Sequence, residues 1–126
     1  MKLNKNNPRL IIVQLLYSYS LNSQKLLFDF KNPYKRFIKK MCNGVIENDS
    51  VLEKKLIEFL DQKFDIKKFE VIFTLILKSA IYEIFFYKKT PFKVVIDEYL
   101  NISKMFLNDK QKNIVNAVLD KIAKTT

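Results

Sequence analysis

The sequence predicts an all-α protein, and three observations lead to that prediction. One Gly and three Pro among 126 residues favour helices with short connections. Apolar side chains recur every three or four residues along most of the chain, as on one face of an α-helix. Each proline follows Asn or Thr, a combination typical of a helix start. Residues 1–126 are expected to be a single domain, whose six amphipathic helices share one core or two abutting bundles.

The most apolar stretch, residues 66–87, is expected to form one central helix that is buried on most sides. A wide apolar stripe runs along it, made by Phe69, Ile72, Phe73, Leu75, Ile76, Leu77, Ala80, Ile84 and Phe86. A membrane span is the alternative, but from Val71 onward the stretch is barely long enough. Lys78 and Glu83 would then lie in the bilayer, each at a cost of about 3 kcal/mol. We therefore expect a core helix and no membrane association.

Capping residues indicate where the helices begin. Three starts are predicted at Asn7-Pro8, Asn32-Pro33 and Thr90-Pro91. Asn and Thr oxygens accept the free amides of a first turn, and proline fits at its first position because no amide partner is needed there. Ser50 and Glu53 have the spacing of a capping box. The central helix is expected to start near Asp65, and the last helix near Asn108 or Asp109.

The other five helices are predicted over about residues 8–21, 33–47, 51–62, 91–106 and 110–124. Their buried faces are expected to include Ile12, Leu15, Leu16, Tyr19, Tyr34, Met41, Leu56, Phe92, Tyr99 and Val118. In the second of them a basic cluster, Lys35, Arg36, Lys39 and Lys40, lies on the outer faces. This cluster is either a functional surface or an ordinary solvated face.

The net charge of +10 is concentrated in the first third of the chain. Residues 1–40 carry a net charge of +8 and contain one acid, Asp29, whereas residues 41–126 carry +2. A localised basic field favours nucleic acid as a partner, ahead of a membrane surface or an acidic protein, with general solubility as the alternative. The single Cys42 and the absence of a leader at Met1 predict a cytoplasmic protein.

The chain has few of the groups that catalysis needs. It contains no His, so Cys42 has no histidine base and zinc has neither histidine nor a cysteine pair. The lone Gly44 cannot form a phosphate-binding loop. Asp97 and Glu98 are adjacent on a predicted helix and point about 100° apart, which does not suit a carboxylate pair. We expect a protein without catalytic activity, cofactor or metal.

Five segments, in this order and spacing, carry a resemblance to a known family. They are RLIIVQLLYSY (residues 9–19), NGVIEN (43–48), LKSAIYEI (77–84), TPFKVVIDEYLNISKMF (90–106) and IVNAVLDKIAK (114–124). The last two weigh most, because helix formation does not require the proline, the Ile-Asp-Glu run or the closing Val-Asn-x-Val-Leu-Asp-Lys. On these motifs the chain resembles, over nearly its full length, the NusB family of bacterial transcription antitermination factors.

The resemblance implies a fold and partners that composition alone does not. The fold would be a compact bundle of six to seven amphipathic helices in two packed helical subdomains. The partners would be single-stranded boxA RNA, the ribosomal protein NusE as heterodimer partner, and the antitermination complex of RNA polymerase on ribosomal RNA operons. Two alternatives stay open. One is a protein-interaction module without specific RNA binding. The other is the RNA-binding domain of ribosomal RNA cytosine methyltransferases, although no methyltransferase domain follows Thr126.

The resemblance also implies two groups of RNA-binding residues. In the first group, Lys2, Lys5 and Arg9 would neutralise phosphates, and Tyr17 would stack on an unpaired base. The second group, at the start of the last helix, consists of Lys110, Lys112 and Asn116, which would contact phosphates or base edges. Tyr17 is equally consistent with a partly buried ring, and Asn116 with a structural hydrogen bond.

Other motif residues are assigned to packing or to a protein partner. For Tyr82 and Glu83, packing and hydrogen bonding between helices are favoured over a direct functional role. Phe69 and Phe73, in the first half of the central helix, are candidates for contact with NusE, because apolar residues are in excess there. Complete burial inside this chain is the alternative for both phenylalanines.

Several positions depart from the family pattern. Only Arg9 remains of a segment that is usually arginine-rich, and Lys2 and Lys5 replace bidentate phosphate binders. Ile114 stands where an aromatic residue is common, and Leu107 and Ala117 stand where glycine is expected. The basic cluster of residues 35–40 is a hypothetical substitute for the lost arginines, to be tested by glutamine replacements and the salt dependence of RNA binding.

Overall fold

The computed structural model describes residues 7–125 of the chain, and every regular element in that part is helical. The elements in order are α1 (Pro8–Asn22), α2 (Lys35–Glu47), α3 (Asp49–Phe59), a 3₁₀ turn η1 (Ile66–Lys68), α4 (Val71–Tyr82), a π-helical turn η2 (Glu83–Tyr87), α5 (Phe92–Phe106) and α6 (Asp109–Thr125). The predicted all-α class and its six helices are confirmed.

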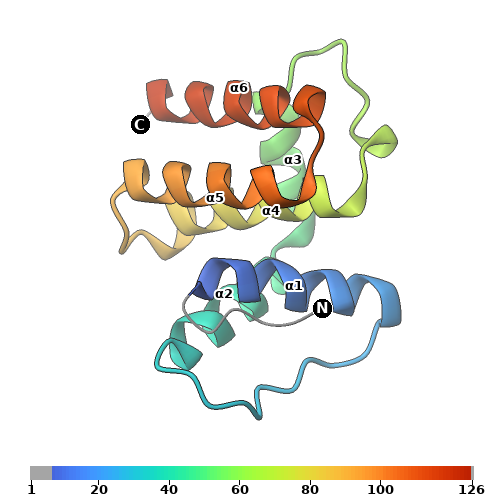
Figure 1. Cartoon of the computed structure of the whole chain (residues 1–126). Coiled ribbons are helices and arrows are strands. Elements are labelled where there is room, and N and C mark those ends of the chain that lie inside the picture. The colour runs from blue at the N-terminus through green and yellow to red at the C-terminus, as the bar shows by residue number, and fades with distance from the viewer. Residues whose placement is uncertain (1–6, 126) are drawn as a thin grey trace.

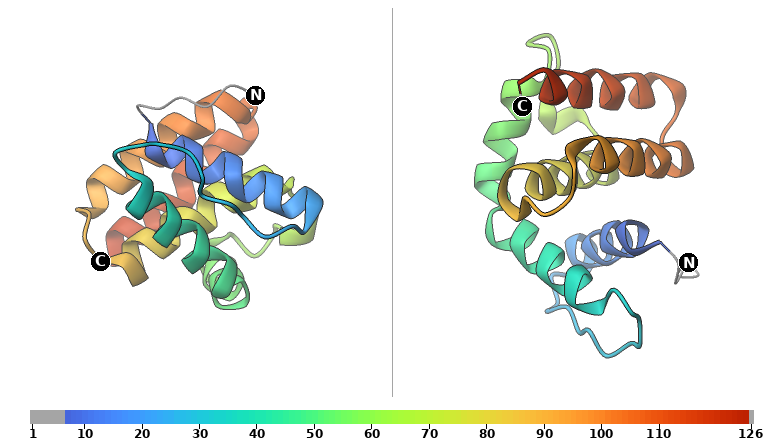
Figure 2. Two further views of the ribbon diagram at one scale, coloured as in Figure 1. Left: turned by 90° about the horizontal axis from the view of Figure 1, so that it is seen from below. Right: turned by 90° about the vertical axis from the view of Figure 1, so that its left-hand side faces the viewer.

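The helices are stacked in layers, with α4 and α5 in the middle (Figure 1). Below them α1 and α2 pack together, and α1 also lies against α4 and α5. Above them α6 packs on α5, while α3 leads from the lower layer towards the upper one along one side, as the right-hand view of Figure 2 shows. The two packed helical subdomains that were expected correspond to α1 with α2 and to the group of α3, α4, α5 and α6.

Two of the predicted helix starts, at Asn7 and Asn108, are capped by the expected side chains. Helices α2 and α5 begin at Lys35 and Phe92, and neither has the side-chain cap expected from Asn32 or Thr90. The Leu10 amide donates to Asn7 Oδ1 at 3.1 Å, and Pro8 is the first residue of α1. The Gln111 amide donates to Asn108 Oδ1 at 2.9 Å at the start of α6. Asp65 accepts from the Lys67 amide at 3.0 Å, although it caps only the short turn η1. Local hydrogen bonding therefore determines these boundaries.

The predicted capping box at Ser50 and Glu53 is wrong. Helix α3 already begins at Asp49, so Ser50 lies inside the first turn. The residue before the helix is Asn48, whose side chain donates to the carbonyl of Gly44 at 2.8 Å instead of capping α3. Because α2 ends at Glu47, the two helices follow each other with a single residue between them. The predicted capping box required Ser50 to precede the helix, but the close α2–α3 junction places Ser50 within it.

The prediction of one continuous central helix over residues 66–87 is wrong at both ends. At the first end η1 is followed by Phe69 and Glu70 in extended conformation, so α4 begins only at Val71. At the second end the chain widens into η2, where the Lys88 amide donates to the Glu83 carbonyl and Lys88 has a φ of 61°. A π-helical turn shifts the side chains that follow it around the helix axis. None of the helices formed by residues 7–125 is both long and apolar enough to cross a bilayer.

The core is centred on α4, as the apolar stripe predicted. Phe73, Ile76, Leu77 and Ala80 are completely buried, and helices α1, α2, α3, α5 and α6 each pack against this helix. Tyr34 and Phe92 were expected on buried faces, and both predictions are wrong. Tyr34 lies just before α2 and is 48% exposed, and Phe92 is the first residue of α5 and is 43% exposed. At the end of a helix the apolar stripe extends beyond the neighbouring helix. The last residue of the stripe is therefore not covered by that neighbour and stays exposed.

Candidate nucleic-acid interface

Arg9 forms an ion pair that joins the first helix to the end of the central one. Its Nε and Nη2 donate to the two carboxylate oxygens of Glu83 at 2.9 and 2.6 Å. The Glu83 side chain is completely buried, the Arg9 side chain is 13% exposed, and the guanidinium also lies 5.1 Å from the centre of the Phe37 ring. The favoured interpretation of Glu83 as a helix-to-helix hydrogen-bonding residue is confirmed. A phosphate contact by Arg9 remains a prediction, and it would have to share the guanidinium with this pair.

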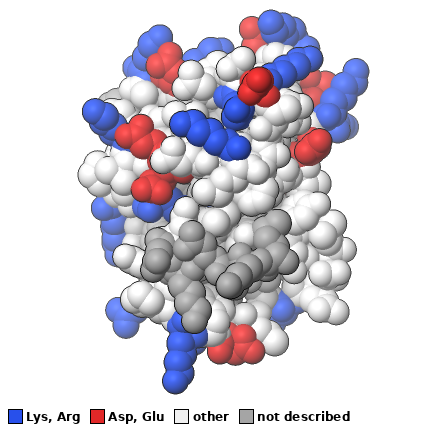
Figure 3. All heavy atoms as spheres, in the orientation of Figure 1, with Lys and Arg blue, Asp and Glu red and all other residues white. Residues whose placement is uncertain are grey.

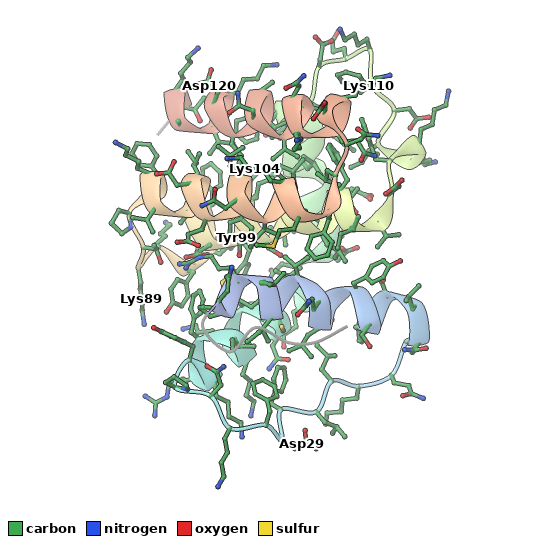
Figure 4. All side chains as sticks on the ribbon, in the orientation of Figure 1. Asp29, Lys89, Tyr99, Lys104, Lys110 and Asp120 are labelled. Atoms are coloured by element: carbon green, nitrogen blue, oxygen red, sulfur yellow. The ribbon has the colours of Figure 1, made fainter. Side chains whose placement is uncertain are left out.

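A buried tyrosine lies close to the Arg9–Glu83 pair. Tyr99 lies between α5 and α1 (Figure 4) and is completely buried. Burial raises the pKa of the Tyr99 hydroxyl well above its usual value, and the neighbouring Glu83 carboxylate raises it further, so the phenol stays protonated. Burial alone would lower the pKa of Arg9, but the hydrogen bond and charge of Glu83 outweigh it and the pKa is raised. The Arg9 guanidinium therefore remains charged inside the protein.

Tyr17 lies on the exposed side of α1 and is 37% exposed. It borders an apolar groove of about 600 Å³, which we call the Tyr17 groove; its lining residues are Gln14, Leu15, Tyr17, Ser18, Leu21, Ile72 and Phe106. Leu21 is 65% exposed. Figure 3 shows that the surface over the second half of α1 is largely uncharged, whereas acidic and basic side chains alternate over the upper helices. The groove suits an aromatic base or an apolar side chain.

The predicted residues of α6 lie in the upper layer. Lys110 and Asn116 are exposed, and Lys112 forms an ion pair with Asp109 at 2.9 Å. Lys110 borders a second depression, of about 340 Å³, which we call the Phe69 hollow; its other lining residues include Lys63, Phe64, Lys68, Phe69 and Ile114. Lys63 and Lys68 were not predicted, because they come from the turn before α4 and approach Lys110 only in the folded chain.

The two phenylalanines proposed for partner contact differ in accessibility. Phe73 is completely buried, so for this residue the alternative of burial inside the chain describes the structure. Phe69 is half-buried and stacks on Phe73 with ring centres 4.3 Å apart and on Phe64 at 5.7 Å. Phe69 therefore covers Phe73 and is itself part of the lining of the hollow. Contact with NusE remains a prediction for this position.

The fold brings some of the predicted residues together and separates others. Ile72 of the Tyr17 groove and Phe69 of the hollow are three residues apart at the start of α4, so both depressions lie at the same end of the molecule. Tyr17 and Lys110 nevertheless belong to different layers, separated by α4 and α5 (Figure 1). Lys2 and Lys5 lie outside the described residues. Within residues 7–125 the candidate interface is thus two neighbouring depressions, and not one continuous basic stripe.

The described residues contain little that could perform a reaction. No three Cys, Asp or Glu side chains within residues 7–125 come together to hold a metal ion. Burial raises the pKa of the Cys42 thiol to about 12, which makes it a poor nucleophile near neutral pH. What the surface offers is aromatic faces, apolar depressions and ammonium groups. Groups of these kinds are suited to binding other molecules.

The layered fold and these surfaces define the class of compact, all-helical binding proteins. Within that class the chain belongs to the NusB family, because the family model described as "NusB family" matches residues 6–124. Similar proteins include the "Transcription antitermination protein NusB" of Haemophilus influenzae, 32% identical over 94% of this chain and 88% of that protein. The protein of the same name from Campylobacter jejuni is 29% identical over 95% and 96%. These relatives are named as transcription antitermination proteins and not as enzymes.

Solved structures agree with this assignment. The structure of Thermotoga maritima NusB superposes with a TM-score of 0.82 at 26% identity and covers 98% of this chain and 93% of that one. A structure described as antitermination factors NusB and NusE in complex with double-stranded RNA has a TM-score of 0.78 at 15% identity and covers 99% and 100%. At that identity the second likeness shows a shared fold.

Proposed function

We propose that this chain is a cytoplasmic transcription antitermination factor that binds boxA-type single-stranded RNA as a heterodimer with NusE. In this role it acts with RNA polymerase, chiefly on ribosomal RNA operons, as a single RNA-binding domain. The observation that carries the proposal is the family match over residues 6–124. Relatives named as antitermination proteins and a structural neighbour crystallised with NusE and double-stranded RNA add support.

The proposed RNA contacts follow from exposure and charge. Tyr17 offers an accessible ring for base stacking, and Lys110 offers an ammonium group beside the start of α6, where free amides also favour phosphate. Asn116 lies on the exposed side of the same helix and can reach a base edge, and Lys112 can bind phosphate by exchanging its Asp109 partner. Lys2, Lys5 and Arg9 complete the proposed set.

Binding measurements with labelled RNA test this function. Fluorescence anisotropy of a boxA-like single-stranded RNA, a scrambled RNA and a double-stranded RNA is measured with and without NusE over a range of salt concentrations. We expect NusE to tighten binding of the boxA-like RNA by tenfold or more and to leave the scrambled RNA unchanged. Tyr17→Ala is expected to weaken boxA binding by about 1–3 kcal/mol, the typical contribution of one stacked base. Equal, NusE-independent binding of all three RNAs would contradict the proposal.

We propose the Tyr17 groove as the docking site of NusE, with Phe69 of the neighbouring hollow as a further contact. Leu21, Ile72 and Phe106 present apolar surface there that no other part of residues 7–125 covers, and a permanent partner would bury it. Leu21→Glu is expected to lower NusE affinity at least tenfold, because a carboxylate would be desolvated in the interface. The affinity is measured by isothermal titration calorimetry.

The matched control for the docking site is Leu27→Glu. Leu27 is 70% exposed, similar to Leu21, but it lies in the loop between α1 and α2 and outside the groove. NusE affinity should be unchanged in this variant, and thermal unfolding should show that both variants fold. Equal losses in the two variants, or no loss for Leu21→Glu, would place NusE on a different surface.

A second function is favoured by one specific observation. Arg9, the remaining arginine of the N-terminal segment, is held by Glu83 inside the protein. That arrangement suits a module that binds NusE and contributes nothing to RNA recognition. It predicts full NusE affinity together with boxA binding that Tyr17→Ala leaves unchanged, which is the opposite of the result expected above.

A further inference from the structure

The net positive charge of the described chain is concentrated on α2 and on the loop before it. Six basic side chains lie between residues 23 and 40 against the single acid Asp29, and all six are exposed: Lys25, Lys31, Lys35, Arg36, Lys39 and Lys40. None of them forms an ion pair with an acidic residue of the described part. Arg9, by contrast, is neutralised by Glu83, and Lys78 by Asp49. The basic field of the first third therefore has its described centre at α2.

Three of these lysines surround one depression. Lys25 from the loop and Lys35 and Lys39 from α2 line a hollow of about 720 Å³, together with Phe28 and Asn43 and without any acidic side chain. Lys35 and Lys39 are one helical turn apart, so their charges repel each other. An anion between the three ammonium groups would relieve this repulsion. The lining thus favours a phosphate over a neutral or cationic ligand.

Aromatic rings are interleaved with these charges. Tyr34, which directly precedes Lys35, is 48% exposed and presents its ring to solvent. Tyr87 lies between two ammonium groups, with Lys40 Nζ 5.7 Å and Lys89 Nζ 5.6 Å from the ring centre. Lys89 lies beside the lower layer in Figure 4 and so extends the positive surface beyond α2. Alternating cations and aromatic faces are typical of surfaces that follow a single strand of nucleic acid.

This α2 surface is separate from the sites proposed for boxA and NusE. Tyr19 borders the basic hollow, whereas Tyr17 borders the apolar groove; two residues apart, they point about 200° apart around α1. The loop that carries Asp29 lies at the opposite end of the molecule from Lys110 (Figure 4). An RNA strand bound at α6 or at Tyr17 would therefore not occupy the α2 surface with the same nucleotides.

We propose that the α2 surface, formed by Lys25, Lys35, Arg36 and Lys39 with Tyr34, is a second RNA site that holds the sugar–phosphate backbone of single-stranded RNA flanking the specifically recognised element. The inference rests on the proposed function, because it extends the RNA contact of the same protein. Lysines that contact phosphates carry no sequence information. The site adds affinity and salt dependence and leaves sequence discrimination unchanged.

Two charge-matched triple variants test this site. Lys35→Gln/Arg36→Gln/Lys39→Gln removes three charges from the α2 surface. Lys54→Gln/Lys104→Gln/Lys121→Gln removes three exposed and unpaired charges from α3, α5 and α6. Anisotropy is measured over a salt series with NusE present, on a boxA-like RNA with an unstructured polyuridine extension and on the same RNA without it.

We expect the α2 variant to lose about tenfold in affinity for the extended RNA at low salt. The slope of log affinity against log salt should become shallower by about 2, since each phosphate contact on a single strand contributes about 0.7. The preference for boxA over a scrambled sequence should stay as in the unmodified protein. The affinity of the control variant for the extended RNA should change less than twofold. The two variants should bind the short RNA with similar affinity.

The opposing outcomes separate the two proposals. If the unmodified protein with NusE binds boxA specifically and both triple variants bind the extended RNA alike, the α2 site is refuted while the proposed function stands. If the unmodified protein shows no specific RNA binding, the proposed function fails and this inference fails with it. If the α2 variant loses binding to phosphatidylglycerol vesicles but keeps its RNA affinity, the surface serves a membrane and the RNA site is refuted.

Discussion

Glu83→Ala is expected to lower the free energy of unfolding by about 3–5 kcal/mol, because it leaves the Arg9 guanidinium buried without its counter-ion. The carboxylate of Glu83 accepts two hydrogen bonds from Arg9, at 2.9 and 2.6 Å, and is completely shielded from water. Most of the loss in stability comes from the Arg9 charge that stays buried without a partner, and only part comes from the lost attraction between Arg9 and Glu83. Urea unfolding followed by circular dichroism measures the change.

A second variant separates charge burial from packing. Arg9→Met/Glu83→Leu removes both charges and keeps apolar volume between α1 and η2, so it is expected to recover most of the stability that Glu83→Ala loses. Asp120→Ala serves as the surface control, because its pair with Lys124 is largely exposed and should contribute less than about 1 kcal/mol. Equal losses for Asp120→Ala and Glu83→Ala would show that burial of the Arg9 pair has no special energetic weight.

Gly44→Ala is expected to destabilise the protein by about 2 kcal/mol, although alanine is the better helix former. Replacing an interior glycine with alanine normally stabilises a helix by about 1 kcal/mol. Here the new Cβ would lie 2.6 Å from Cε1 of Tyr82 and closer still to its Cζ and hydroxyl oxygen. The ring cannot move away freely, because it is 9% exposed and stacks on Phe86 with centres 5.6 Å apart. The clash therefore outweighs the gain in helix propensity.

Two further variants check that Tyr82 is the cause. Asn43→Ala, at the exposed neighbouring position of α2, should leave the urea midpoint nearly unchanged. Tyr82→Leu removes the ring atoms that the new Cβ would contact. The loss of unfolding free energy caused by Tyr82→Leu should therefore be smaller in the Gly44→Ala variant than in the unmodified protein. A Gly44→Ala variant as stable as the original would show that the ring shifts without cost and that the close approach is not constrained.

The parts of the fold that local chemistry controls were predictable from the sequence. Asn7 with Pro8, and Asn108, cap the helices they were expected to cap, because a side chain reaches the amides of its own first turn whatever surrounds it. The stripe of Phe73, Ile76 and Leu77 identified the buried face of the central helix. The residues that resemble the NusB family identified the family, which the comparison over residues 6–124 then showed.

The candidate site was predicted less well, because its geometry depends on contacts between distant residues. Arg9 was assigned to phosphate binding, and nothing near it in the chain indicates that Glu83, 74 residues away, takes up its charge. Lys63 and Lys68 join Lys110 only because η1 folds back against the start of α6. Phe69 and Phe73 have the same residue type and lie on one stripe, yet one is half-exposed and the other completely buried.

The sequence by itself determined that the chain is helical, where most helices start, which faces are apolar and to which family it belongs, since periodicity, capping and motif order are encoded locally. Only the tertiary structure decided how the central stretch is divided into η1, α4 and η2, which charges are neutralised and which remain on the surface. The physical reason is that burial and pairing depend on which neighbour covers a side chain. In the packed structure Arg9 is largely buried and paired with Glu83, whereas the lysines of α2 are exposed and unpaired.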